Sequence, residues 1–158
     1  MLFQRVNRSN PEKVFIVAKN TYDTATLTNG QAVMWDYASD ADGVGVTKPA
    51  DQTGRAGSYG TAFAGIAAES IAPGEYGLLQ VYGYHSAVRV RSNTGDTPAV
   101  VAGTALTQKN AVFCLESAEP APVATSTLTV VNFRWVGFAL AARAEFTTAA
   151  IAVFIKGL

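Results

Sequence analysis

Short apolar runs separated by turn-forming residues recur along this sequence, at a spacing of roughly 8–12 residues. Asn29-Gly30 and Pro73-Gly74 are typical turn dipeptides, and in residues 87–91 valine alternates with arginine, which indicates a strand with one solvated face. The runs lie at residues 14–17, 33–37, 44–46, 61–67, 78–83, 87–91, 104–107, 111–115, 128–131, 134–140 and 151–155. The pattern predicts an all-β fold, a small β-barrel, β-tulip or sandwich built of short strands and hairpins.

The chain is expected to form one domain. Its 158 residues are 49% hydrophobic, which is enough for a core without disulfides or metals. Residues 1–12 show no sustained period and contain Asn10-Pro11, so we expect an extended N-terminal arm followed by a single β domain over 13–158. Residues 38–60 are rich in glycine and aspartate and are expected to form a long loop region around the short strand at 44–46.

Two segments of the sequence echo each other. Residues 63–83 and 136–157 each hold a strand rich in glycine and alanine, a short polar turn and an apolar strand that ends in glycine. Two copies are too few for a stacked solenoid. We therefore expect paired hairpins that close one small barrel.

The charge composition argues against several classes of partner. The chain has 12 basic and 12 acidic residues, and charged residues are only 15% of it, against about 25% in an average soluble domain. The basic residues are scattered, which speaks against nucleic-acid binding. The apolar stretch 136–158 is interrupted by Arg143 and Glu145, so no membrane-spanning helix is expected, and the N-terminus lacks a signal-peptide pattern. Few charges and no net charge favour association with other subunits.

Candidate catalytic residues are few. A nucleophilic triad would have to use the single histidine, His85, which lies between two expected strands and is interpreted as a surface or interface residue. Cys114 sits in an apolar run and is expected in the core. As the single cysteine it cannot form an internal disulfide, which fits folding in a reducing cytoplasm. Glu69 and Glu75 flank one turn, where solvated carboxylates are more common than a glycosidase pair.

Two further motifs are weak matches to binding sites. Asp40 and Asp42 resemble the start of a calcium loop, but Val44 stands where an oxygen ligand is needed, so an Asp/Gly turn is preferred and a weak cation site stays open. The glycines at 54, 57 and 60 lack the lysine of a phosphate-binding loop. The sequence therefore predicts no catalytic residue, cofactor or metal, and no enzyme.

Residues 65–83, GIAAESIAPGEYGLLQVYG, resemble the strand-turn-strand of tailed-bacteriophage capsid decoration (cement) proteins. Residues 95–98, 102–106 and 136–140 resemble further hairpins of that family, and the similarity covers 60–115 and 134–157 through short motifs. The chain differs from the simplest members in its 38–60 region and in its arm.

This resemblance implies a β-barrel or β-tulip subunit without an active site, assembled as a trimer on the outer surface of a phage head. The implied partners are further copies of the chain and the major capsid protein, and the implied role is to stabilise the shell against internal DNA pressure. The implied location is the capsid exterior of the virion, after synthesis in the host cytoplasm.

Alternative functions are another virion component, such as a head fibre base, a neck or a tail protein, or a soluble β-barrel that binds a small ligand or a glycan. Under the preferred hypothesis the arm orders on a neighbouring subunit or on the shell, although a frayed terminus is an equal alternative. The expected partner contacts are Met1, Leu2, Phe3, Val6, Tyr59, Tyr84 and His85.

Overall fold

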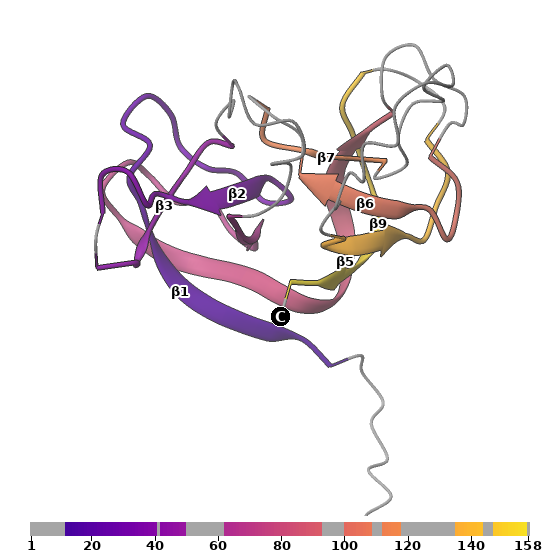
Figure 1. Ribbon diagram of the computed structural model, residues 1–158, viewed down its shortest axis with the longest axis horizontal. Helices are drawn as coiled ribbons and strands as arrows, with labels where there is room; N and C mark the ends of the chain where they lie inside the picture. The colour runs from indigo at the N-terminus through magenta and orange to yellow at the C-terminus, as the bar shows by residue number, and fades with distance from the viewer. Residues whose placement is uncertain are drawn as a thin grey trace, which may run out of the picture.

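The computed structural model describes residues 12–40, 42–49, 62–92, 100–108, 112–117, 135–143 and 147–157. They contain nine strands of one sheet (Figure 1). The strands are β1 (Val14–Asn20), β2 (Ala32–Trp35), β3 (Gly45–Thr47), β4 (Phe63–Ala67), β5 (Tyr76–Arg91), β6 (Ala105–Gln108), β7 (Leu115–Ser117), β8 (Gly137–Ala139) and β9 (Ala149–Lys156). The prediction of an all-β fold is confirmed. No helix long and apolar enough to cross a membrane occurs within these described ranges.

The strand pairings close two rings that share β5. The order along the sheet is β1-β3-β2-β4-β5-β7-β6-β8-β9, and additional pairings join β1 to β5 and β5 to β9. Ring 1 is therefore β1-β3-β2-β4-β5, and ring 2 is β5-β7-β6-β8-β9. Figure 1 shows β5 running from one ring into the other, with β1 beside its first half. The expectation of one small barrel is corrected to two fused rings.

The two rings have the same topology. Each contains one parallel pair, β1–β3 in ring 1 and β5–β7 in ring 2, and the other four pairings of each ring are antiparallel. Strands β1, β2, β3, β4 and the first half of β5 thus correspond to the second half of β5, β6, β7, β8 and β9. The chain is a structural duplication in which one strand serves both halves.

Corresponding strand pairs of the two rings agree in register as well as in direction. Between β2 and β4, the ring 1 pairs Ala32↔Ile66 and Val33↔Gly65 correspond to the ring 2 pairs Ala105↔Phe138 and Leu106↔Gly137 between β6 and β8. Between β4 and β5, the pairs Ile66↔Gln80 and Ala67↔Leu79 correspond to Phe138↔Phe154 and Ala139↔Val153 between β8 and β9. The echo in the sequence is therefore real. Its two hairpin-like segments, however, occupy the same place in different rings instead of closing one barrel together.

Apolar side chains fill both rings. The ring 1 cluster consists of Ala18, Leu27, Val33, Val46, Ala64, Ala67, Ile71 and Leu79. The ring 2 cluster consists of Val88, Val90, Val100, Leu106, Leu115, Val136, Ala139, Ile151, Val153 and Ile155, together with Ala32 and Ile66 from ring 1. Since two side chains of ring 1 belong to the core of ring 2, the rings are packed against each other and are not independent units.

Strand β5 corrects two predictions at once. Residues 78–83 and 87–91 were expected as separate strands with a turn at His85, but they belong to one strand of 16 residues. The register against β9 shifts between His85 and Val88, so the local irregularity is a bulge and not a turn. A bulge lets the strand bend from one ring into the other without ending.

The Asn29-Gly30 turn is present, but it does not join two strands into the hairpin that this dipeptide favours between residues 21–29 and 33–37. Gly30 has a φ of 85°, as such a turn requires, and the Thr28 N–H donates to Oε1 of Gln31 at 2.7 Å. Residues 21–29 nevertheless form no named strand, and Leu27 makes only an isolated bridge to Ile71. The turn leads into β2, which pairs with β3 and β4 instead.

Several expectations lie outside the described residues. These are residues 1–11 of the expected arm, residues 50–60 of the expected loop region, and the strand expected at 128–131. Of the strand expected at 111–115, only Leu115 lies in β7.

Candidate interaction surfaces

Large apolar side chains cover the outer side of β1 and the first half of β5. Val17 pairs with Leu78, and Lys19 pairs with Tyr76, so these side chains share one face. Val17 is 63% exposed and Tyr76 is 62% exposed, and Phe15 and Leu78 are exposed as well. The Lys19 Nζ lies 6.0 Å from the centre of the Tyr76 ring. We call Phe15, Val17, Tyr76 and Leu78 the β1–β5 face. Adjoining exposed apolar residues of this kind mark interaction sites.

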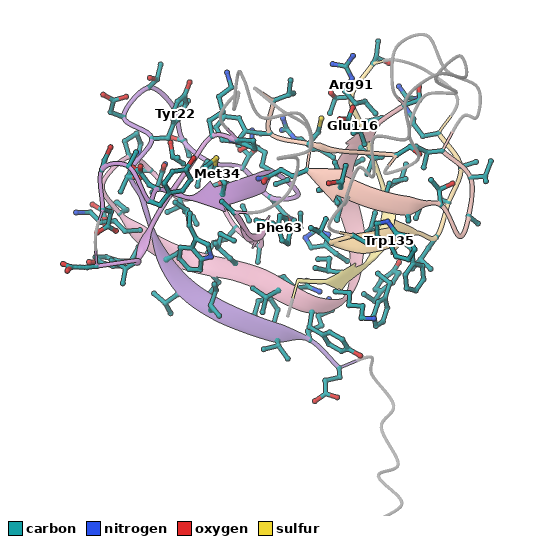
Figure 2. All side chains as sticks on the ribbon, in the orientation of Figure 1. Tyr22, Met34, Phe63, Arg91, Glu116 and Trp135 are labelled. Carbon is teal, nitrogen blue, oxygen red and sulfur yellow. The ribbon has the colours of Figure 1, made fainter. Side chains whose placement is uncertain are left out.

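A second apolar surface lies on ring 2. Trp135 is 68% exposed, and Phe138 stacks on Phe154 with ring centres 5.2 Å apart. A pocket of about 250 Å³ is lined by Gly103, Ala105, Trp135, Gly137, Phe138 and Lys156. Figure 2 shows Trp135 on the outer side of ring 2, whereas Phe63 lies between the two rings. We call Trp135, Phe138 and Ala105 the Trp135 surface.

His85 is buried within β5 and is only 7% exposed. The Ala87 N–H donates to its Nδ1 at 3.1 Å, so the neutral ring acts as an acceptor. Burial lowers the pKa of His85 below its ordinary value of 6.5, and the charge of Lys13 lowers this pKa further. The interpretation as a surface residue in a turn is wrong, because His85 lies within β5, pairs in register with the buried Val153 and is itself buried. Tyr84 is half-buried in β5 and pairs with Phe154.

The buried histidine leads to a pH-dependent stability. Because the folded state holds His85 with a lowered pKa, it binds fewer protons than the unfolded state near and below pH 6.5. The contribution of His85 to the free energy of unfolding is therefore present above pH 6.5, the ordinary pKa of histidine, and is lost as the pH falls below that value. We expect the free energy of unfolding, measured by urea denaturation, to fall from about pH 7.5 to about pH 5.5. His85→Gln keeps an acceptor and cannot be protonated, so this fall should be smaller in the variant. An equal fall in both proteins would contradict the assignment.

Asp40 organises the loop before β3. Its carboxylate accepts hydrogen bonds from the N–H groups of Asp42 at 3.1 Å and Val44 at 3.2 Å, and from that of Gly45. The preferred Asp/Gly turn is confirmed. Among the described residues, His, Cys, Asp and Glu side chains form no group of three that could hold a metal ion.

The other residues considered as catalytic candidates, Glu69, Glu75 and Cys114, lie in a turn or in the core. Glu69 Oε1 accepts from the Leu78 N–H at 2.8 Å, and Glu75 closes the turn in which Gly74 has a φ of 81°. Cys114 is fully buried, as expected for a core residue. The carboxylates of Asp40 and Glu69 and the ring of His85 thus accept hydrogen bonds from backbone N–H groups.

The predicted partner contacts stay predictions. Met1, Leu2, Phe3, Val6 and Tyr59 lie outside the described residues. For Tyr84 and His85 the structure gives positions but no partner, and a role in contacts stays a prediction. Both exposed apolar surfaces were missed, because alternation within an apolar strand does not tell which face is covered.

No family model matches this sequence, and no curated protein matches it either. Among solved structures, the chain is similar to the head fiber gp8.5 N base of bacteriophage phi29. The two chains are 11% identical with a TM-score of 0.45, and the alignment covers 92% of this chain and 97% of that chain.

Proposed function

We propose that this protein is a structural subunit of a bacteriophage virion, a decoration (cement) protein that binds the outer surface of the head. The observation that carries the proposal is the β1–β5 face, where Val17 and Tyr76 are each more than 60% exposed. The resemblance of residues 65–83 to cement proteins points to the same role. The partner is the major capsid protein, and the effect of binding is to hold neighbouring capsomers together against the pressure of packaged DNA.

The chemistry of the β1–β5 face suits a permanent contact with a protein shell. Burying its apolar side chains is favourable, and Lys19 is the one charged side chain of the described strands paired across this face. An apolar contact avoids the desolvation of ion pairs, whose penalty can exceed the Coulombic gain. Such a contact also weakens little with ionic strength.

The interior of the fold favours this function over ligand binding. A β-barrel that binds a small ligand keeps its cavity inside the strands. Here the side chains of the two clusters fill the rings, with Leu27, Val33 and Leu79 in ring 1 and Leu106 and Val153 in ring 2 all fully buried. A surface that recruits a partner therefore fits this molecule better than an enclosed binding site.

Binding to heads tests the proposal. Purified protein is added to heads assembled without it, and the bound fraction is measured after sedimentation. The double variant Tyr76→Ser/Leu78→Ser should weaken binding roughly ten- to a hundredfold, since the loss of two partly buried contacts is worth about 1.5–3 kcal/mol. Tyr37→Ser is the matched control, because Tyr37 is 57% exposed but lies outside the β1–β5 face.

Two results would overturn the proposal. One is equal binding of the double variant and the control. The other is a copy number of only a few per particle, measured by quantitative mass spectrometry of purified virions, which would indicate a head fibre, neck or tail component instead.

A further inference from the structure

A polar pocket of about 180 Å³ lies where β5 passes from ring 1 into ring 2. We call it the β5 pocket. None of its described lining side chains is acidic, and the polar ones are Lys13, Asn29, Gln80, His85 and Ser86. Pockets that enclose drug-sized ligands measure about 300–1,000 Å³, so this one fits a single small molecule or group.

One wall of the β5 pocket is the chain that enters β1. Gly83 of β5 has a φ of 99°, and a Cβ at this position would overlap the carbonyl oxygen of Glu12. The backbone just before β1 therefore lies directly on β5. This close approach holds Lys13 beside the bulge that contains His85.

The opposite wall is the turn at residues 28–31. A Cβ on Gly30 would overlap the Ala87 carbonyl oxygen, and the Arg89 N–H donates to the Gly30 carbonyl at 2.8 Å. The turn is thereby fixed on β5, and Asn29 lines the same pocket as Ser86. Both walls are held by backbone contacts, so the pocket is formed before any ligand enters.

Two buried side chains form the polar floor of the pocket. His85 is 7% exposed, and its Nδ1 accepts from the Ala87 N–H, so the proton of the neutral ring is on Nε2. Gln80 is 1% exposed, and its Nε2 donates to the carbonyls of Tyr82 and Tyr84, each at 3.1 Å. The remaining groups are a donor, His85 Nε2–H, and an acceptor, Gln80 Oε1.

The charge of the pocket selects an anion. Lys13 brings a positive charge close enough to lower the pKa of His85. With one cation and neutral donors around it, the pocket matches the single charge of a carboxylate better than the double charge of a phosphate. Phe15 and Ala68 supply an apolar wall for the carbon atoms of the acid. The acceptor on Gln80 requires a donor on the ligand, which a hydroxyl group provides.

We infer that the β5 pocket binds a small hydroxy acid. Its carboxylate accepts from the Lys13 ammonium and from His85 Nε2–H, and its hydroxyl donates to Gln80 Oε1. The pocket adjoins the β1–β5 face at Phe15 but includes none of the other residues of that face. The inference therefore does not depend on the proposed binding to a phage head.

The test observes the ring of His85 by NMR during titration of the full-length protein with lactate at pH 7.5. The chain has one histidine, so the ring signals need no further assignment. A saturable shift with a millimolar Kd is expected, whereas sodium chloride at the same ionic strength should give no saturable shift. Lys13→Gln should weaken lactate binding roughly fivefold. Lys19→Gln is the matched control, because it removes the same charge from β1 outside the pocket.

Propionate tests the role of Gln80 without a substitution in the core. It differs from lactate only by the hydroxyl group, so it should bind roughly two- to tenfold more weakly. The inference is overturned by a missing saturable shift, by an equal shift with chloride, by equal binding in the two lysine variants, or by equal affinities for the two acids. No phage head takes part in this experiment, so its failure is distinguishable from failure of the proposed function.

Discussion

Gly30→Ala is expected to destabilise the protein by about 3 kcal/mol or more, while Gly103→Ala costs about 1 kcal/mol. Both glycines occupy the same place in equivalent turns and have nearly the same positive φ, 85° and 93°. The conformational penalty is therefore shared. Only at Gly30 does a methyl group also meet the main-chain carbonyl of Ala87, which cannot move without shifting β5.

The measurement is the free energy of unfolding from urea denaturation, made at a protein concentration at which each variant is monomeric. Gly103→Ala is the matched control, because it changes the same residue type in the same backbone geometry with open space around it. Equal losses in the two variants would show that the turn at residues 28–31 does not pack on β5. A selective loss at Gly30 would establish the contact between the rings in solution.

Ile66→Ala is the second large change, with an expected loss of about 3 kcal/mol, within the usual 2–5 kcal/mol for truncating a buried isoleucine. Ile66 is fully buried and belongs to the ring 2 cluster although it lies in ring 1. Its truncation opens a cavity at the point where both rings meet. The whole molecule should then unfold at lower urea in one transition.

Phe138→Ala is the matched variant at the equivalent position of ring 2. Phe138 is 39% exposed and stacks on Phe154, so about 1 kcal/mol is expected from the lost ring contact. The comparison is made at a low and equal protein concentration for both variants. If Phe138→Ala proved as damaging as Ile66→Ala, the Trp135 surface would be part of the fold and not a free surface.

Short-range features were predictable from the residues. The apolar runs at 14–17, 33–37, 44–46 and 61–67 each overlap a strand, because β-branched and apolar residues between turn formers favour extended backbone. The Pro73-Gly74 turn was predictable for a similar reason, since only glycine readily takes the positive φ found there. The role of Asp40 in its turn follows equally from local hydrogen bonding.

The continuity of β5 was not predictable. Gly83 and the residues 84–86 resemble a turn, yet the strand continues because β9 pairs with it on both sides of the bulge, at residues 82–85 and 88–90. Each backbone group in a strand is satisfied by a neighbour that is distant in sequence. The choice between a turn and a bulge therefore depends on a strand that begins more than sixty residues later.

For the candidate surfaces, too, the sequence predicts residue type but not exposure. The sequence shows that Phe15, Val17, Trp135 and Phe138 are apolar, but not which of them are covered. Ile66 and Phe138 occupy equivalent positions in an echoed motif, and only the placement of ring 2 on ring 1 buries the first and leaves the second exposed.

The sequence by itself determines three properties of this protein: its low charge, its content of strands and turns, and its internal echo. They depend only on composition and on neighbours in sequence. Only the tertiary structure decides how two rings close on a shared strand, and why the turn at Gly30 packs on β5 while its copy at Gly103 has open space around it. Both features depend on long-range pairing, since the same local motif is core or surface according to what the rest of the chain packs against it.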